Sequence, residues 1–150
     1  MSDDALATST QATSLPARHL FSITANLGRA VRIPGGPSGS RVIVAVTGGT
    51  FSGERLSGKV ADEPGGDWVT QREDGSIKLD VRICLETDDG ASIFVTYFGI
   101  AVPGEDGLSI RTAPLFETGD ERYRWLNSIQ AVGIGTSSGG TVRYEVYELL

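Results

Sequence analysis

The sequence predicts an all-β protein that forms a single antiparallel β-barrel of about nine strands with one short helical turn. Three observations support this fold class. Apolar and polar residues alternate over most of the chain from residue 18 onward, as in strands with one buried face. Clusters rich in glycine and proline separate these stretches, and the 150 residues include 20 glycines. Only 21% of the residues are charged, which suits a turn-rich β protein better than a helix bundle.

The chain begins with a stretch that lacks this alternation. Residues 1–17 are rich in Ser, Thr and Ala and predict a disordered tail, so a single barrel domain is expected over residues 18–150. Strand-like alternation starts at once, and the Gly- and Pro-rich residues 33–40 then predict a loop. The β-branched run at 41–49 predicts a strand that is buried on both faces or faces a subunit partner.

Glycines and turn signals mark the next part of the chain. Glycines recur around Phe51, Leu56 and Val60, and glycines within strand patterns mark the bulges and bends that barrel closure requires. The segments 63–68 and 72–76 predict turns, the second through its Asp-Gly pair. Short strands joined by such turns favour an antiparallel barrel.

The clearest hairpin covers residues 79–99, LDVRICLETDDGASIFVTYFG. A two-residue Asp-Gly turn at 89–90 would place Arg82 opposite Tyr97. One face would then carry Asp80, Arg82, Cys84, Glu86, Ile93, Val95 and Tyr97. The other face would carry Leu79, Val81, Ile83, Leu85, Phe94, Thr96 and Phe98.

This division of side chains leaves two arrangements open. If the aliphatic face forms the core, Asp80 and Arg82 are a surface ion pair. If the polar face lines a cavity, the aliphatic face must be covered by a helix or by another subunit.

An irregular segment at residues 110–135 interrupts the strand pattern. Pro114 ends a strand, and Thr118 with Glu121 matches a T-x-x-E capping box, which predicts a short helical turn near residues 119–128. We expect this segment to plug one end of the barrel. The chain then finishes with two strands joined by a glycine-rich hairpin turn.

Charge and composition exclude several classes of partner. The net charge is −6 and the pI is about 4.7, so nucleic acids and anionic membranes would be repelled. Cys84 is the only cysteine, which excludes an intrachain disulfide and a cysteine metal cluster. The sequence has no secretion-signal pattern and no apolar run long enough to span a membrane. We therefore expect a cytoplasmic protein without a metal or other cofactor, and with neither nucleic acid nor membrane as partner.

Two motifs that suggest known chemistry fail on inspection. GERLSGKV at residues 53–60 is close to a phosphate-binding loop, but Val60 replaces the hydroxyl that would hold magnesium and no helix pattern follows. His19, the only histidine, lies beside the predicted tail, and no nucleophile motif accompanies it.

Carboxylates beside aromatic or cationic residues are better catalytic candidates. Asp67 lies next to Trp68, and a carboxyl group that is desolvated against aromatic rings can gain a raised pKa and act as general acid or base. Asp80 lies near Arg82, and an arginine can stabilise negative charge that develops in a reaction. Arg111 could supply a second cation. Ordinary ion pairing at strand ends is the alternative interpretation.

Blocks of sequence along the chain resemble the family catalogued as domain of unknown function 3237. The blocks are GGTFSGERLSGKV, PGGDW, LDVRICLETDDGASIFV, IRTAPLFETGDERYRWLN and VGIG, and their order and spacing carry the resemblance from Leu20 to the C-terminus. The resemblance implies a compact, lipocalin-like antiparallel barrel that forms homo-oligomers. Through relatives that look like cyclases, it also implies addition of a hydroxyl across an activated carbon–carbon double bond. Residues 96–99 depart from the more polar segment of these relatives, which leaves the role of Tyr97 open.

The resemblance favours a polar cavity, because the family pattern includes Asp67, Asp80, Arg82 and Arg111. We expect a cofactor-free enzyme whose cavity binds a small, partly aromatic or enone-like organic molecule. Asp80 or Asp67 would be the general base, while Arg82 and Arg111 would stabilise an enolate-like charge.

Aromatic side chains are expected to form the walls that orient this molecule. The expected ligand-binding residues are Trp68, Tyr97 and Trp125. One alternative is a non-catalytic, lipocalin-like carrier or sensor that uses the same pocket. Another is an interaction module whose aliphatic strand face is a dimer interface.

Overall fold

The computed structural model describes residues 13–150, so most of the predicted tail at residues 1–17 lies outside the described residues. These residues form ten β-strands and one short 3-10 helix, which confirms the prediction of an all-β, barrel-like fold with about nine strands. The strands are β1 (Ala17–Gly36), β2 (Gly39–Ser52), β3 (Ser57–Val60), β4 (Gly66–Gln71), β5 (Ile77–Thr87), β6 (Ser92–Gly104), β7 (Gly107–Thr112), β8 (Leu115–Glu117), β9 (Ala131–Ser138) and β10 (Thr141–Leu149), and the helix is η1 (Glu121–Ser128).

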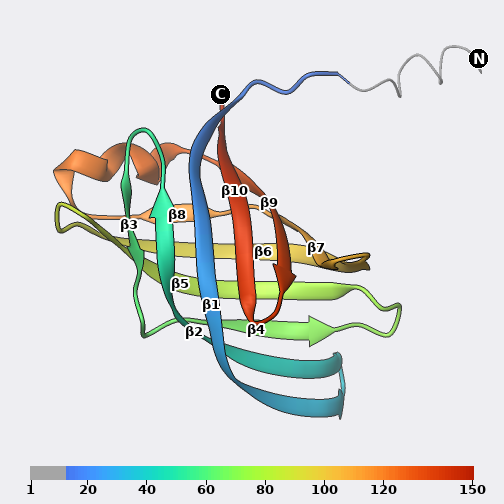
Figure 1. The fold of residues 1–150 in the computed structure, drawn as a ribbon. Coiled ribbons are helices and arrows are strands. Elements are labelled where there is room, and N and C mark those ends of the chain that lie inside the picture. Colours follow the sequence, from blue (N-terminus) through green and yellow to red (C-terminus); the bar gives the residue numbers. More distant parts are fainter. Residues whose placement is uncertain (1–12) are drawn as a thin grey trace, which may run out of the picture.

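All the strands belong to one antiparallel sheet that closes on itself (Figure 1). Hydrogen bonding runs in the order β4–β2–β1–β10–β9–β7–β6, and β5 completes the ring by pairing with both β4 and β6. Two positions in the ring are shared by short strands. β3 and β4 both lie between β2 and β5, while β7 and β8 both pair with β6. The fold is therefore β-barrel-like, with its buried side chains inside.

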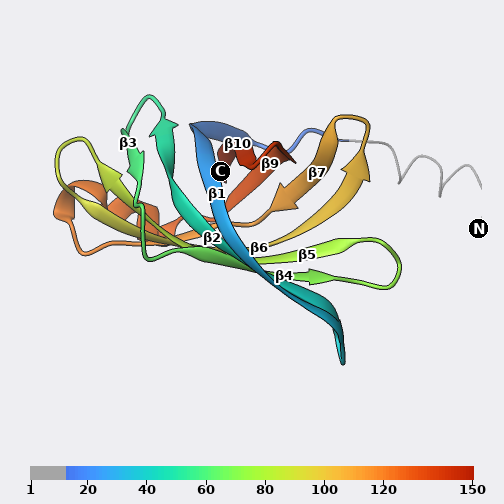
Figure 2. The same cartoon turned by 60° about the horizontal axis from the view of Figure 1, so that its bottom comes forward.

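The first hairpin is longer and tighter than the sequence predicts. β1 continues to Gly36 and β2 begins at Gly39, so the expected loop at 33–40 is wrong for most of its length. Gly35 and Gly39 have positive φ angles of 66° and 105°, which lets the chain reverse within a few residues. Figure 2 shows this β1–β2 hairpin projecting past the rest of the barrel.

One end of the barrel is tightly packed. The rings of Phe51 and Phe116 meet the ring of Phe21 edge to face, with centroids 5.4 and 6.0 Å from it. The helix η1 lies at this end and contributes two buried side chains, Tyr123 and Leu126, to the core (Figure 1). The segment after β8 thus plugs the barrel, as the sequence predicts.

Asp120 caps the helix, so the predicted capping box of Thr118 and Glu121 is wrong. The Asp120 carboxylate accepts a hydrogen bond from the backbone N–H of Arg122 at 3.0 Å and pairs with its guanidinium at 2.8 Å. These hydrogen bonds lower the pKa of Asp120 to about 2. The Thr118 hydroxyl instead accepts from the Asp120 N–H and donates to the carbonyl of Ser92, which fixes the approach to the helix.

A buried carboxylate links the first and last strands to this plug. Glu148 of β10 is buried and accepts hydrogen bonds from Arg18 at 2.7 Å and from Arg55 at 3.0 Å. The Arg55 guanidinium also lies 3.5 Å above the centroid of the Trp125 ring. Because a buried carboxylate is stable only when it is paired, this network joins β1, β10, the β2–β3 loop and η1.

The register between β5 and β6 differs by one residue from the predicted register. Arg82 pairs with Thr96 rather than with Tyr97. A shift of one residue moves every side chain of one strand to the opposite face. Tyr97 therefore joins the aliphatic side chains of β5 inside the barrel, whereas Asp80 and Arg82 face outward. The aliphatic side chains of β5 form the core, so they cannot form a dimer interface, whereas Phe94 and Phe98 of β6, which the sequence predicts on the same face, are exposed.

The turn between these strands explains the register. Three residues, 88–90, form the loop instead of two, and the Thr87 N–H donates to the carbonyl of Ala91 at 2.9 Å. Gly90 adopts a φ of 93°, which a three-residue hairpin loop requires near its end. The Thr87 hydroxyl donates to the Asp89 carboxylate at 2.7 Å and holds the wider loop in place.

The outer surface combines a short helix with an apolar strip of sheet. In residues 13–150, no helix is long and apolar enough to cross a bilayer. The exposed apolar side chains of this strip lie on β6, β8 and β9 and are Phe94, Phe98, Ile100, Val102, Leu115 and Ile134.

The predicted bend near residues 48 and 49 is present, and β1 and β2 approach each other closely there. Gly49 has a φ of 140°, and a Cβ atom added there would lie 2.0 Å from the carbonyl oxygen of Thr24. Both the backbone conformation and the close approach therefore require glycine. The next pairing of β1 with β2 is irregular, between Ala25 and Leu27, as barrel curvature demands.

We expect Gly49→Ala to lower the free energy of unfolding by about 2–4 kcal/mol, since it adds backbone strain to a clash with the neighbouring strand. Urea denaturation measures this loss. Gly119→Ala is the matched control, because a Cβ atom there meets nothing within 4 Å. It should change stability by less than about 0.5 kcal/mol. Equal effects of the two substitutions would contradict the assignment of Gly49 as the point of close approach.

Candidate functional site

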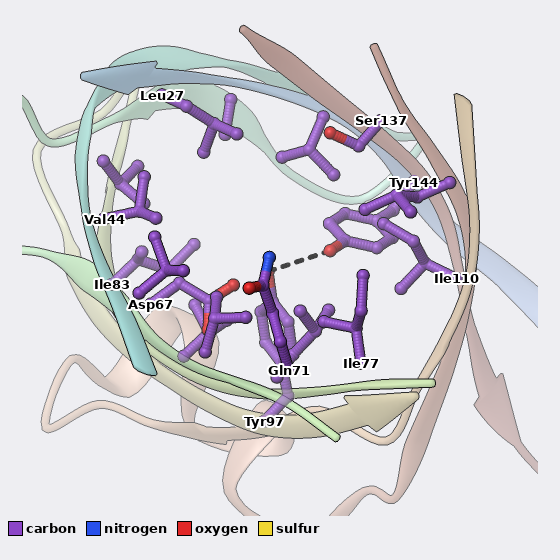
Figure 3. A pocket seen from close by; sticks show the side chains of 18 of the residues that line it. Leu27, Val44, Asp67, Gln71, Ile77, Ile83, Tyr97, Ile110, Ser137 and Tyr144 are labelled. Atoms are coloured by element: carbon purple, nitrogen blue, oxygen red, sulfur yellow. Dashed lines mark hydrogen bonds between the residues drawn. The ribbon is translucent and has the colours of Figure 1, made fainter. Parts of the chain in front are cut away.

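The end of the barrel opposite η1 contains a cavity of about 180 Å³ (Figure 3). Its walls are mainly aliphatic and come from strands all around the ring. The wall residues include Leu27, Val42, Val44, Val46, Val69, Ile77, Leu79, Val81, Ile83, Ile110 and Val142. A cavity of about 150 Å³ holds one benzene ring, so this space suits a small organic molecule.

Asp67 brings a carboxyl group into these apolar walls. Its partners on the two neighbouring strands, Val44 of β2 and Val81 of β5, both line the cavity. Figure 3 shows the Asp67 side chain pointing inward on the same side of the cavity as Val44. One carboxylate oxygen accepts a hydrogen bond from the backbone N–H of Asp80 at 3.0 Å. The carboxylate thereby satisfies a donor on β5 while it faces the cavity.

Burial governs the ionisation of Asp67. It raises the pKa of the carboxyl group from 3.8 to about 6, against the opposing effect of the hydrogen bond from Asp80. The negative charge of the Asp80 side chain adds to the rise. Asp67 can therefore exchange a proton close to neutral pH, which is the property required of a general acid or base.

Two tyrosines face the cavity from neighbouring parts of the wall. The hydroxyl of Tyr97 on β6 donates to the hydroxyl of Tyr144 on β10 at 3.4 Å, and the rings meet edge to face with centroids 5.7 Å apart. Burial raises the pKa of both hydroxyls, and the charge of Asp67 raises both further. The pair stays protonated at neutral pH and can donate hydrogen bonds to a bound oxygen atom.

A glycine on β9 allows Tyr144 to take this position. Gly135 is the cross-strand partner of Tyr144, and a Cβ atom added at Gly135 would lie 2.2 Å from the tyrosine ring. The ring therefore lies flat against bare backbone. Any larger residue at 135 would push Tyr144 toward the cavity.

The mouth of the cavity carries a few further polar groups. Gln71 at the end of β4, Ser137 on β9 and Arg32 on β1 line it. Figure 3 shows the Gln71 side chain extending across the cavity between the Asp67 and Tyr144 walls. Within residues 13–150, no group of three His, Cys, Asp or Glu side chains gathers in a way that could bind a metal ion.

Only two of the residues predicted for the site line the cavity, Asp67 and Tyr97. The predicted placement of Asp80 and Arg82 in the cavity is wrong, because the β5–β6 register turns them outward. Their side chains are 29% and 53% exposed and lie 3.9 Å apart as a surface pair. The Arg82 guanidinium lies 5.1 Å from the ring centroid of Trp68, which also faces outward.

Arg111 and Trp125 lie away from the cavity as well. Arg111 is exposed on the outer face of β7 and donates to the carbonyl of Ile110 at 2.8 Å. Trp125 lies on η1 at the closed end of the barrel, where it packs against Arg55. Of the expected cationic groups and aromatic walls, only Tyr97 lines the cavity, and the other lining groups are mainly aliphatic side chains.

Tyr144 is the main residue that the sequence-based prediction misses. Its signal is present in the last strand, where Val142, Tyr144 and Val146 alternate with polar residues and share the buried face. A tyrosine on a core face has a hydroxyl that needs a partner, and Tyr97 supplies it.

Comparison with known proteins supports the resemblance seen in the sequence. The family model described as protein of unknown function (DUF3237) matches residues 16–149. The UPF0311 protein RPA1785 of Rhodopseudomonas palustris is 30% identical over 151 residues, which cover 91% of this chain and 98% of that protein. A crystal structure of a β-barrel-like protein from Acinetobacter baumannii matches with a TM-score of 0.85 at 28% identity, covering 94% of this chain and 99% of that one.

A fungal relative has a name that states an activity. The hydroalkoxylation enzyme phnH of Penicillium herquei is 33% identical over 115 residues, which cover 76% of this chain and 70% of that protein.

The raised pKa of Asp67 predicts a pH-dependent cost to stability. Below about pH 4 the carboxyl group is protonated in both states, and no cost arises. Between about pH 4 and 6 only the unfolded chain ionises fully, so wild-type stability falls as the pH rises, by about 2–3 kcal/mol in total. We expect Asp67→Asn to remove this loss, so that its free energy of unfolding rises relative to that of wild type between about pH 4 and 6.

Urea denaturation at a series of pH values from 4 to 8 tests this expectation. Asp106→Asn, in the exposed turn between β6 and β7, controls for the loss of one negative charge. A difference between Asp67→Asn and wild type that stays constant with pH would refute the raised pKa.

Proposed function

This chain belongs to the DUF3237 family of proteins of unknown function, and on that premise we propose that its cavity binds a small organic molecule and catalyses proton transfer on it. The proposed reaction is the cofactor-free addition of a hydroxyl group across an activated carbon–carbon double bond. The observation that carries the proposal is Asp67, whose pKa of about 6 arises inside an otherwise apolar cavity that two tyrosine hydroxyls share.

The positions of these groups divide the chemistry between them. The Asp67 carboxylate would remove the proton from the hydroxyl of the bound molecule, and the oxygen would attack the far carbon of an enone within the same molecule. The negative charge would then pass to the enone oxygen, where Tyr97 or Tyr144 would donate a hydrogen bond. Asp67 would finally return its proton to the carbon next to the carbonyl.

Atoms balance in this sequence, because the product is an isomer of the substrate. One C–O and one C–H bond form while the O–H bond and the double bond are lost. No electrons leave or enter the molecule. The aliphatic walls would exclude water, which strengthens the hydrogen bonds to the developing charge and limits competing hydration.

The name of the Penicillium relative supports this class of reaction, since hydroalkoxylation is the addition of a hydroxyl to a double bond. The aliphatic character of most of the lining favours a second candidate, a carrier that holds a small apolar ligand without changing it. The two candidates use the same cavity and differ only in what Asp67 does.

We expect the protein to accelerate ring closure of ortho-hydroxyphenyl propenyl ketone to a methylchromanone, a compound of one ring and a short chain that suits the cavity volume. Asp67→Asn should lower kcat/KM by about 100-fold or more, since it removes the general base. In wild type, kcat/KM should rise with pH and level off above about pH 6, where free Asp67 is ionised. Initial rates by chromatography, corrected for spontaneous closure, measure both effects.

Asp80→Asn is the matched control, because Asp80 is a nearby carboxylate on the outer face of β5. Its kcat/KM should stay within about twofold of wild type. Full activity of Asp67→Asn would refute the proposed base. Saturable stabilisation of the protein by the ketone without any acceleration would favour the carrier.

A further inference from the structure

Arg32 occupies a distinctive position among the arginines of the chain. It is the cross-strand partner of Val42, whose side chain is buried in the cavity wall, so the two side chains lie on the same, inward face. Arg32 itself is exposed, which places it at the mouth rather than in the depth of the cavity. Among the described residues, Arg32 and Asp67 are the only charged ones in the cavity lining.

The register of the strands sets the order of these two charges along the barrel. Val42 is opposite Val69 of β4, and Asp67 is opposite Val44. Arg32 is therefore level with Val69, which is the next inward-facing residue of β4 after Asp67 toward the mouth. Two residues of a strand span about 7 Å, so Arg32 lies about that much nearer the mouth than Asp67. From the mouth inward, a ligand would meet a cation first and an ionisable carboxyl group second.

No carboxylate of the protein neutralises Arg32 within the described part of the chain. The salt bridges formed by residues 13–150 engage Arg18, Arg55, Arg82 and Arg122, together with one lysine and the histidine. Glu148 pairs with two of these arginines, whereas Arg32 forms no hydrogen bond or ion pair with another side chain of residues 13–150. Its planar group of donors is free to bind an external anion.

We propose that Arg32 selects organic carboxylates, with the carboxylate bound at the mouth and the apolar body inside the barrel. The proposal rests on the cavity being a ligand site, and it names the substrate class of that site. Charge orders the ligand, because ionised Asp67 repels a second anion at depth while Arg32 attracts it at the mouth. The neutral end of the molecule, which carries the reacting hydroxyl or carbonyl, is thereby directed to Asp67 and the tyrosine pair.

Two probes that differ only in charge test the proposal. 3-Phenylpropanoate and 3-phenylpropanamide have the same ring, chain and nearly the same shape, and isothermal titration calorimetry at pH 7.5 gives the affinity of each. Wild type should bind the carboxylate about fivefold or more tightly than the amide, as a charge-assisted contact at a partly exposed site allows. Arg32→Gln should bring this ratio close to one and leave the amide affinity unchanged.

Two further variants locate the effect. Arg29→Gln removes another exposed arginine of β1 that does not line the cavity, so it should preserve the ratio. Arg32→Glu should reverse the preference in favour of the amide. Asp67→Asn should leave the carboxylate preference in place, because the anion does not reach that depth.

The outcomes separate this inference from the function on which it rests. Equal binding of both probes by wild type, or a carboxylate preference that survives Arg32→Gln, would overturn the role of Arg32 while the cavity remained a ligand site. Binding of neither probe would overturn the ligand site and this inference with it. Loss of the carboxylate preference in Asp67→Asn would mean that the preference depends on the deep carboxyl group rather than on Arg32, which also overturns the inference.

Discussion

Closure of the barrel rests on the pairing of β5 with β6, and the Thr87–Ala91 turn holds the register of that pair. The turn is itself braced from the plug. Asp89 accepts hydrogen bonds from the Tyr123 hydroxyl at 2.8 Å, and Arg122 pairs with the same carboxylate at 3.3 Å. The helix therefore does more than fill the end of the barrel, because it fixes the loop whose length determines which side chains enter the interior.

The contents of the cavity follow from that register. Because Thr96 is opposite Arg82, the side chains of Val95 and Tyr97 on β6 face the interior. The hydroxyl of Tyr97 then lies within hydrogen-bond distance of the Tyr144 hydroxyl. Asp67 enters from β4, on the other side of β5. An apolar wall gives an ionised carboxylate little solvation, so the arrangement that shifts the pKa toward neutrality also costs stability at neutral pH. Such a cost is typical of groups that are held ready for proton transfer.

Much of the architecture could be predicted from the sequence because its signals are local. The alternation of apolar and polar residues predicted the strands, and Asp-Gly and Gly-Gly pairs predicted the hairpin turns. The irregular segment at 110–135 predicted the plug. The short strands β3 and β8 could not be predicted, because four and three residues are too few to show an alternation of apolar and polar side chains. The loop expected at 33–40 proved to be paired backbone because glycines there bend a hairpin rather than end it.

The candidate site was less predictable because it depends on register. Both faces of β6 carry apolar side chains, with Ile93 and Val95 on one face and Phe94 and Phe98 on the other. Alternation alone could not decide which set faces inward, and a turn one residue longer than expected reversed the answer. Asp67 could be found because its signal, a carboxylate beside an aromatic residue within a strand, did not depend on that turn. The alternation of β10 places Tyr144 on a buried face, but its contact with Tyr97 could be predicted only if β10 were already placed between β1 and β9.

The groups that would take part in the reaction and the group that would select the ligand lie in different parts of the barrel. Asp67, Tyr97 and Tyr144 lie on β4, β6 and β10, each of which is paired with a strand on both sides. Arg32 lies on the hairpin that projects beyond the ring, where one strand edge and a glycine turn leave more freedom (Figure 2). A substitution on the hairpin can alter the charge at the mouth without moving the carboxyl group or the tyrosine pair. The fold therefore permits the charge at the mouth to change independently of the groups that are proposed to transfer a proton.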